Sequence, residues 1–244
     1  MRTRLQPLSH YRPSTACIAL MSALSALPAH SQSLCSSDGQ TPPTALFERF
    51  INAECDTCWR DPSTPTGGTD ALTLDWIVPS PLGDAAALSA AASRDALWRL
   101  ESLSRSAPST QNSQRIQVTA WPGASLRVAH GVALGGYLGA SIELLLPQSH
   151  GLTWPLQAWL VLVEPLPPGV ADSPVSRNLV RNVLQTIWNM RETLLNSEQL
   201  GFKEMRALNI PEGANPQRLR LVGWVQDAQG QILATSESAC PLGE

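Results

Sequence analysis

The stretch Glu54-Cys55-Asp56-Thr57-Cys58-Trp59 places two cysteines at a Cys-x-x-Cys spacing directly after the run Ala45-Leu46-Phe47-Glu48-Arg49-Phe50-Ile51. The run is mostly apolar and short, which predicts a buried strand that ends at the cysteines. A Cys-x-x-Cys pair at the end of a strand is typical of a redox centre or of a local structural disulfide.

The first 31 residues have the pattern of an export signal. Residues 1–12 carry three arginines and no acidic residue, and residues 16–27 are apolar, about the length of the apolar region of a signal peptide. This apolar region is shorter than the roughly 20 residues that a membrane-spanning helix needs. We therefore expect residues 1–31 to be a signal peptide, with cleavage near Ser31 and a periplasmic or secreted mature chain.

Charge and composition exclude several classes of partner. The chain has 17 basic and 20 acidic residues, and removal of residues 1–31 would change its formal charge from −3 to −6. Lys203 is the single lysine, and no basic cluster occurs, so binding to nucleic acid or to anionic lipid is not expected. We expect no membrane span and no cofactor. A protein partner in the cell envelope is expected, and the sequence leaves its identity open.

Four cysteines, Cys35, Cys55, Cys58 and Cys240, remain after cleavage. An even number of cysteines in an exported chain predicts that all are oxidised. Of the three pairings, the favoured one joins Cys55 to Cys58 and Cys35 to Cys240. The second bond would close a loop of roughly 200 residues and stabilise the fold by several kcal/mol. The two rival pairings would each link the Cys-x-x-Cys pair to a chain end.

The apolar patterns change at residues 106–114, which we take as a domain boundary. Before it, strands are expected at 45–51 and 72–78, and Asp84 is the expected N-cap of a helix from 85 to about 104. The segment 177–190 fits a helical period better than alternation, but helix and strand both stay open. After the boundary, strands are expected at 115–121, 125–130, 137–146, 156–164, 218–226 and 231–236, the last two as a hairpin.

Five short segments resemble an uncharacterised family of secreted thioredoxin-like proteins of Gram-negative bacteria. They are Phe50 to Cys58, Leu74-Asp75-Trp76, Trp159-Leu160-Val161, Asn178-Leu179-Val180-Arg181 and Trp224-Val225-Gln226-Asp227. The resemblance implies an α+β fold, with a reduced thioredoxin-like α/β part at 35–112 followed by a β-sandwich-like part at 115–240. It also implies that residues 177–190 contain a strand.

The resemblance implies a thiol chemistry with three residues. Cys55 would be the nucleophile, Cys58 the resolving thiol and Asp75 a buried base near them. The alternative for Asp75 is a carboxylate that caps a turn at the end of its strand. The family has a helix after the cysteines, whereas the prolines and glycines between Pro62 and Gly68 cannot continue one here.

The residues around the cysteines favour a structural disulfide over a redox centre. Glu54 and Asp56 flank Cys55, and negative charge raises the pKa of a neighbouring thiol. Arg60 is the one cation close by in the sequence. No metal site is expected, because His130 and His150 are twenty residues apart and in no recognised ligand spacing.

Two functions follow from these observations. The favoured one is a non-catalytic protein of the cell envelope, in which two disulfides stabilise a binding or assembly module. The alternative is a periplasmic thiol–disulfide oxidoreductase that uses Cys55 and Cys58. The sequence leaves open whether the chain is an enzyme, and it does not identify a ligand.

Overall fold

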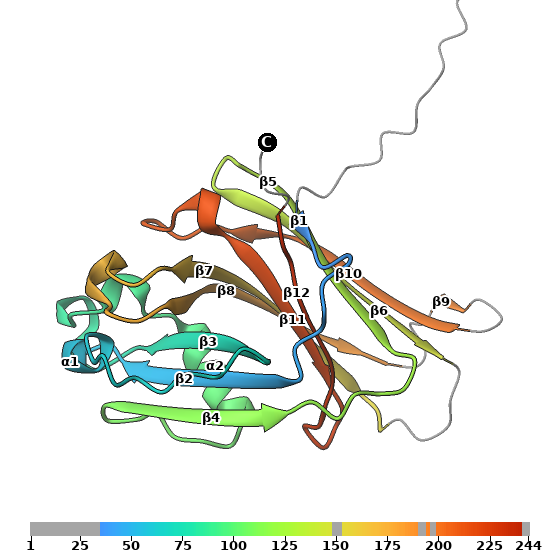
Figure 1. Ribbon diagram of the computed structural model, residues 1–244, viewed down its shortest axis with the longest axis horizontal. Coiled ribbons are helices and arrows are strands. Elements are labelled where there is room, and N and C mark those ends of the chain that lie inside the picture. The colour runs from blue at the N-terminus through green and yellow to red at the C-terminus, as the bar shows by residue number, and fades with distance from the viewer. Residues whose placement is uncertain (1–34, 148–152, 190–193, 196–198, 241–244) are drawn as a thin grey trace, which may run out of the picture. The chain divides into compact units, whose positions relative to one another are not determined.

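The strands of this chain form two sheets (Figure 1). The computed structural model describes residues 35–147, 153–189, 194–195 and 199–240, so the expected signal peptide lies outside the described residues. One sheet has the strand order β1-β5-β6-β10-β9 and is antiparallel throughout. Its strands are β1 Cys35–Ser36, β5 Ser125–Leu134, β6 Tyr137–Pro147, β10 Gln199–Asn209 and β9 Leu194–Leu195.

The second sheet is mixed and has seven strands in the order β12-β11-β7-β8-β3-β2-β4. Within it β2 runs parallel to β3 and β3 runs parallel to β8, while the other neighbours are antiparallel. Its strands are β2 Ala45–Asn52, β3 Ala71–Val78, β4 Gln111–Gln117, β7 Leu156–Leu166, β8 Arg177–Trp188, β11 Arg220–Gln226 and β12 Ile232–Glu237.

Helical structure in the described residues is short. The α-helices are α1 Asp56–Trp59 and α2 Arg94–Ser102. Single 3-10 turns lie at η1 Gly83–Ala85, η2 Ser89–Ala91, η3 Val170–Asp172 and η5 Pro216–Arg218. None of the described helices is long and apolar enough to cross a membrane.

Strand β7 is buried on both faces and separates two apolar cores. Leu160 and Leu162 point towards the five-stranded sheet, where they join Ile142 and Leu144 of β6. The intervening residue Val161 points to the opposite face, in the cluster that contains residues of α2. Successive strand residues point to opposite faces, so a strand covered on both sides is apolar at every position. The fold is therefore two packed sheets with α2 on the outer face of the larger one.

Helix α2 is attached to the sheet by a buried ion pair. Arg99 donates from Nε and one terminal nitrogen to the two carboxylate oxygens of Glu48 on β2, each at 2.9 Å. Its guanidinium also lies 5.0 Å from the ring centroids of both Trp159 and Trp224. The side chains of Arg99 and Glu48 are inaccessible to solvent. A bidentate pair over aromatic faces is a geometry that favours arginine.

The expected fold class is wrong. The described residues are mostly β structure in two sheets and do not form a thioredoxin-like α/β part followed by a separate sandwich. Strands β2, β3 and β4 from the first half lie in the same sheet as β7, β8, β11 and β12 from the second half. The polar segment at 106–114 leads into the edge strand β4, which pairs with β2 and buries little of its own surface.

The helix expected from 85 to about 104 is also wrong in extent. It is replaced by η1, η2 and the nine-residue α2, whose N-cap is Ser93 rather than Asp84. The amide of Leu88 donates to the Ala53 carbonyl at 2.9 Å, and that of Ser93 donates to the Ile77 carbonyl at 3.1 Å. These bonds, to the residue that follows β2 and to the end of β3, replace the i to i−4 bonds that a continuous helix needs.

Most of the expected strands are present, with shifts of a few residues. The open segment 177–190 contains β8, which pairs with β7 over almost its whole length. The expected hairpin is formed by β11 and β12. Strand β10 was not expected from the sequence, because in residues 201–209 only Gly201, Phe202 and Leu208 are buried and the other side chains are polar or exposed.

Candidate functional site around the Cys55–Cys58 disulfide

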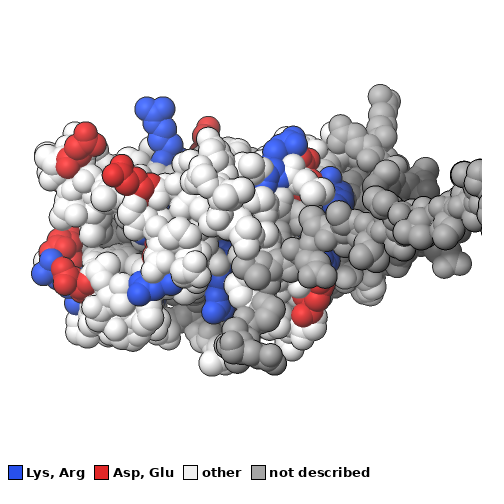
Figure 2. All heavy atoms as spheres, turned by 90° about the horizontal axis from the view of Figure 1, so that it is seen from above, with Lys and Arg blue, Asp and Glu red and all other residues white. Residues whose placement is uncertain are grey.

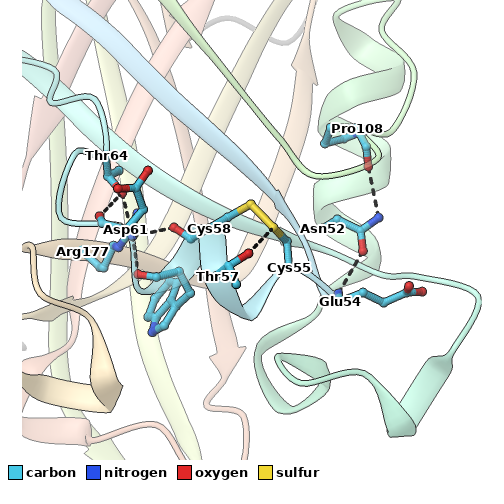
Figure 3. The surroundings of a disulfide bond; sticks show 10 residues. Asn52, Glu54, Cys55, Thr57, Cys58, Asp61, Thr64, Pro108 and Arg177 are labelled. Atoms are coloured by element: carbon cyan, nitrogen blue, oxygen red, sulfur yellow. Dashed lines mark hydrogen bonds between the residues drawn. A yellow bond between two sulfur atoms is a disulfide. The ribbon is translucent and has the colours of Figure 1, made fainter.

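The turn that carries the two cysteines begins where β2 ends. The side-chain oxygen of Asn52 accepts the amide of Glu54 at 2.9 Å, and its backbone carbonyl accepts the amide of Cys55 at 2.9 Å. Its side-chain nitrogen donates to the Pro108 carbonyl at 3.1 Å (Figure 3). Asn52 therefore fixes the entry into the turn, as is common for asparagine at a turn position.

Cys55 and Cys58 form a disulfide. Cys55 is partly exposed and Cys58 is buried. The Sγ of Cys55 lies 3.6 Å from the hydroxyl of Thr57, and Figure 3 shows the side chain of Glu54 extending away from the sulfurs. The helical part of the turn, α1, has four residues. So short a helix presents no developed dipole to the sulfur atoms.

The residue after the second cysteine anchors the turn to a distant loop. Trp59 is buried, and its indole nitrogen donates to the Ala171 carbonyl at 2.6 Å. The guanidinium of Arg177 lies over the Trp59 ring, 4.7 Å from its centroid. Both contacts come from residues more than a hundred positions later in the chain, so the turn is held by tertiary structure.

Arg177, at the start of β8, binds the backbone of the turn. One of its terminal nitrogens donates to the Trp59 carbonyl at 2.7 Å, to the Thr64 hydroxyl at 3.1 Å and to the Cys58 carbonyl at 3.3 Å. Its Nε donates to the Ser173 hydroxyl at 2.9 Å. All of these acceptors are oxygen atoms, so the buried guanidinium stabilises the shape of the turn and makes no hydrogen bond to its sulfurs.

Among the residues that the structure describes, Arg177 joins Asp75 to the Cys55–Cys58 turn. Its Oδ1 accepts from Nε of Arg49 at 2.7 Å and from Arg177 at 3.3 Å, and its Oδ2 accepts from Arg49 at 2.7 Å and from the Asn178 amide at 2.8 Å. A carboxylate has about four acceptor positions, and all four are filled here. Burial lowers the pKa of Arg177, and the charge of Asp75 acts in the opposite direction. The carboxylate thus has no free lone pair for a cysteine proton.

The exposed side of the turn carries acidic residues and one arginine. Arg60 pairs with Asp56 at 3.1 Å and with Asp172 at 3.4 Å. These side chains are exposed, so each pair contributes little to stability. Arg60, the cation expected near the cysteines, is thereby directed to carboxylates. Over the face drawn in Figure 2, charged side chains form small scattered groups with uncharged surface between them.

The second disulfide joins Cys35 to Cys240. In the register of β1 and β5, Cys35 lies opposite His130, and a ring nitrogen of His130 and the two sulfurs lie within 4.8 Å of one another. His130 is 5% exposed. Its Nδ1 lies 2.9 Å from the Gly131 carbonyl, while its Nε2 has no hydrogen-bond partner among the described residues.

Sequence reasoning missed Arg49, Arg177 and His130. Arg49 could have been noticed, because it interrupts the apolar run 45–51, and a charge inside a buried strand needs a partner. Arg177 stands in the segment whose secondary structure stayed open. The position of His130 beside Cys35 had no signal in the sequence, because it depends on the pairing of two strands about ninety residues apart.

Comparison with protein-family models, with characterised proteins and with solved structures gave no match. The resemblance to a secreted thioredoxin-like family therefore stays a prediction. The class of protein that the fold defines is a two-sheet β protein with two disulfides and a short Cys-x-x-Cys turn. The turn is bound to a buried ion cluster that consists of Arg49, Asp75 and Arg177.

Proposed function

We propose that this chain is a non-catalytic, disulfide-stabilised binding or assembly module, exported to an oxidising compartment of the cell envelope. The observation that carries the proposal is the contact of Arg177 with the carbonyl oxygens of Cys58 and Trp59. A buried ion cluster holds the turn in the shape that the disulfide closes. The Cys55–Cys58 disulfide therefore stabilises the fold, and its reduction would leave the contacts of Arg177 with the turn unchanged.

The chemistry of thiol exchange gives further support. A working Cys-x-x-Cys needs a stabilised thiolate, which a helix N-terminus or a nearby cation usually provides. Here α1 has only four residues, Arg60 is bound to carboxylates and the donors of Arg177 bind oxygen atoms. The exposed Glu54 and the adjacent Asp56 disfavour a second negative charge at Cys55. Asp75, with its acceptor positions filled, does not serve as a base.

A binding role is supported by apolar side chains exposed on the five-stranded sheet. Leu134 and Tyr137 are directly opposite each other in the β5–β6 hairpin and are 79% and 53% exposed. Met205 on β10 lies opposite Ser141, which shares the face of Tyr137, and is 59% exposed. Leu134 and Tyr137 are neighbours, and Met205 lies farther along the same face. Exposed apolar residues that share a face often belong to protein interfaces. We infer a protein partner, since an acidic chain without a basic cluster does not suit nucleic acid.

The alternative function is thiol–disulfide exchange. It is favoured by one observation, the combination of a partly exposed Cys55 with a buried Cys58. An attackable first sulfur and a protected second sulfur are the arrangement that a nucleophile and a resolving thiol require. The two functions predict different reduction potentials for the Cys55–Cys58 bond and different rates of thiol–disulfide exchange.

The first test is turnover in an insulin-reduction assay with the purified chain and dithiothreitol. We expect the rate to equal that of dithiothreitol alone, and the Cys55→Ser variant to behave like the parent. The matched control is a Cys35→Ser/Cys240→Ser variant, which keeps the Cys-x-x-Cys pair. A rate clearly above background that is lost in Cys55→Ser and retained in the control would establish the oxidoreductase instead.

The second test is a redox titration of the Cys55–Cys58 pair, read by thiol trapping and mass spectrometry. We expect a reduction potential below about −300 mV, which is the range of structural bonds in secreted proteins. A potential between roughly −120 and −270 mV is the range of working oxidoreductases and would contradict the proposal. Export is tested separately, by locating the processed chain in cell fractions.

A further inference from the structure

We propose that reduction of the Cys35–Cys240 disulfide creates a zinc site with Cys35, Cys240 and His130 as its ligands. The two sulfurs and a ring nitrogen of His130 already lie within 4.8 Å of one another. In a tetrahedral zinc site with these ligands the same atoms would be roughly 3.6–3.8 Å apart. Shifts of about 1 Å are therefore enough once the two sulfurs are no longer bonded to each other.

The backbone that carries the three ligands does not depend on the disulfide. The amide of Ser36 donates to the Ala239 carbonyl at 3.0 Å, and the amide of Ala239 donates back to the Ser36 carbonyl at 2.8 Å. The amide of Ser37 donates to the Val128 carbonyl at 2.9 Å, which fixes β1 on β5. The two ends of the unit thus stay side by side after reduction, and the ligands stay together.

His130 is the independent sign that this place can hold a ligand. A buried polar atom almost always has a hydrogen-bond partner, and an unpaired one costs free energy. The Nε2 of His130 is such an atom among the described residues, while its Nδ1 is held by the Gly131 carbonyl. A metal-binding histidine has this arrangement, with one nitrogen bound to a carbonyl and the other free for the metal.

The burial of the ligands suits a site with one open position. Cys35 is 1% exposed and His130 is 5% exposed, whereas Cys240 is on the surface. A metal bound by these three residues is sheltered on the side of β1 and β5, and the side of Cys240 admits a water molecule as fourth ligand. Three protein ligands with one open position is a common zinc arrangement, and thiolate with imidazole favours zinc over magnesium or calcium.

The chemistry balances in two steps. A dithiol reductant transfers two electrons and two protons to the Cys35–Cys240 bond, which breaks to give two thiols, and the reductant becomes a disulfide. Zinc then binds the two sulfurs and the Nε2 of His130 and releases two protons to water. A disulfide oxidant that takes two electrons from the thiolates would re-form the Cys35–Cys240 bond, become a dithiol by taking up two protons from water, and release the metal. The zinc-bound and disulfide states of the site therefore exclude each other.

The experiment uses the chain with Cys55→Ser/Cys58→Ser, so that Cys35 and Cys240 are the remaining thiols of the processed protein. The protein is reduced with a phosphine under anaerobic conditions and titrated with zinc against a chromophoric chelator. We expect one zinc ion per reduced chain and none for the oxidised chain. Cobalt is the spectroscopic probe, and we expect sulfur-to-cobalt charge-transfer bands together with the visible bands of a tetrahedral site.

Variants of His130 decide whether the site is the one described. We expect His130→Asn to lower the zinc affinity by more than about tenfold and to change the visible cobalt bands, and His130→Cys to restore tight binding with stronger sulfur bands. Circular dichroism of each reduced variant checks that the chain is folded. Equal affinity for the parent and His130→Asn, or a reduced chain that unfolds and is not refolded by zinc, would overturn the proposal. Because Cys55 and Cys58 are absent, the outcome is independent of their role.

Discussion

Arg177 makes two separate contacts with Trp59, one with its ring and one with its backbone carbonyl. The guanidinium of Arg177 covers the indole ring at 4.7 Å from its centroid and also donates to the carbonyl of the same residue at 2.7 Å. Together with its bond to Asp75, this makes Arg177 the link between the Cys55–Cys58 turn and the buried ion cluster. The role of that turn therefore depends on a residue more than a hundred positions away.

The first prediction concerns the substitution Arg177→Ala. It removes hydrogen bonds from the carbonyls of Cys58 and Trp59 and one of the two cations at Asp75, so we expect the free energy of unfolding to fall by about 3 kcal/mol. Urea denaturation measures this loss. The control is the exposed Arg94→Ala, which should change stability by less than about 0.5 kcal/mol. Equal effects of the two substitutions would mean that Arg177 does not anchor the turn.

The second prediction concerns the Glu48–Arg99 pair. Glu48→Gln leaves the buried guanidinium of Arg99 without its counter-charge, so we expect a loss of about 3–5 kcal/mol. The double variant Glu48→Leu/Arg99→Met removes both charges and should recover much of that loss, because neither charge then stays buried alone. A double-mutant cycle measures the coupling. The exposed Glu101→Gln, also on α2, is the control and should have little effect.

The third prediction compares the two disulfides. The Cys35–Cys240 bond has a sequence separation of 205 and the Cys55–Cys58 bond a separation of 3. In the chain-entropy model, removal by paired Cys→Ser substitution should cost about 5 kcal/mol for the long loop and about 2 kcal/mol for the short one. Denaturation of the two double variants measures both. A larger loss for the short loop would show that contacts around the turn, and not loop closure, dominate.

The fourth prediction concerns Gly223 on β11, where the two sheets approach closely. A Cβ at this position would lie 2.6 Å from a Val128 methyl carbon and 3.2 Å from Cδ1 of Ile142. Gly223→Ala should therefore push the sheets apart and cost about 1–3 kcal/mol. Gly139→Ala on β6 is the matched control, because a Cβ there would have no atom within 4 Å. The melting temperatures of both variants test this, and a tolerated alanine at 223 would mean that the interface can relax.

The fifth prediction concerns pH and Glu237 on β12. Burial raises the pKa of Glu237, and Arg220 offsets this only in part. The folded state therefore binds the proton more tightly than the unfolded chain, and this stabilisation is lost as pH rises through the folded pKa. Glutamine at position 237 does not ionise, so the Glu237→Gln variant does not lose this stabilisation. The stability of the variant relative to the parent should therefore increase from pH 4 to pH 7. Denaturation curves at both pH values measure this, with the exposed Glu212→Gln as control. A difference that is independent of pH would contradict it.

Much of the strand content could be predicted from local patterns. The apolar runs at β2, β3 and β7 and the hairpin of β11 and β12 are strand-like because their residues recur with the period of a pleated sheet or are apolar throughout. The favoured cysteine pairing is also present in the structure. It followed from the number and position of the cysteines, since two of them are only three residues apart.

The arrangement of these strands could not be predicted in the same way. The helix expected from residue 85 is shortened because the amides of Leu88 and Ser93 bind carbonyls just after β2 and at the end of β3, and no local propensity contains that information. The domain boundary was inferred from the polar segment 106–114 and the thioredoxin-like part from the resemblance. Part of that polar segment belongs to the edge strand β4, which tolerates polar residues because one of its edges has no neighbouring strand.

The amino-acid sequence was sufficient to predict most of the strands and to favour the observed disulfide pairs, because both depend on residues close in the chain or on simple counting. Tertiary structure alone decided which charged groups meet. Asp75, Arg49 and Arg177 come from three strands of one sheet, and His130 reaches Cys35 across a strand pair. Buried charged and polar groups are stabilised where the complete fold supplies their partners, so the chemistry of both cysteine sites depends on long-range contacts.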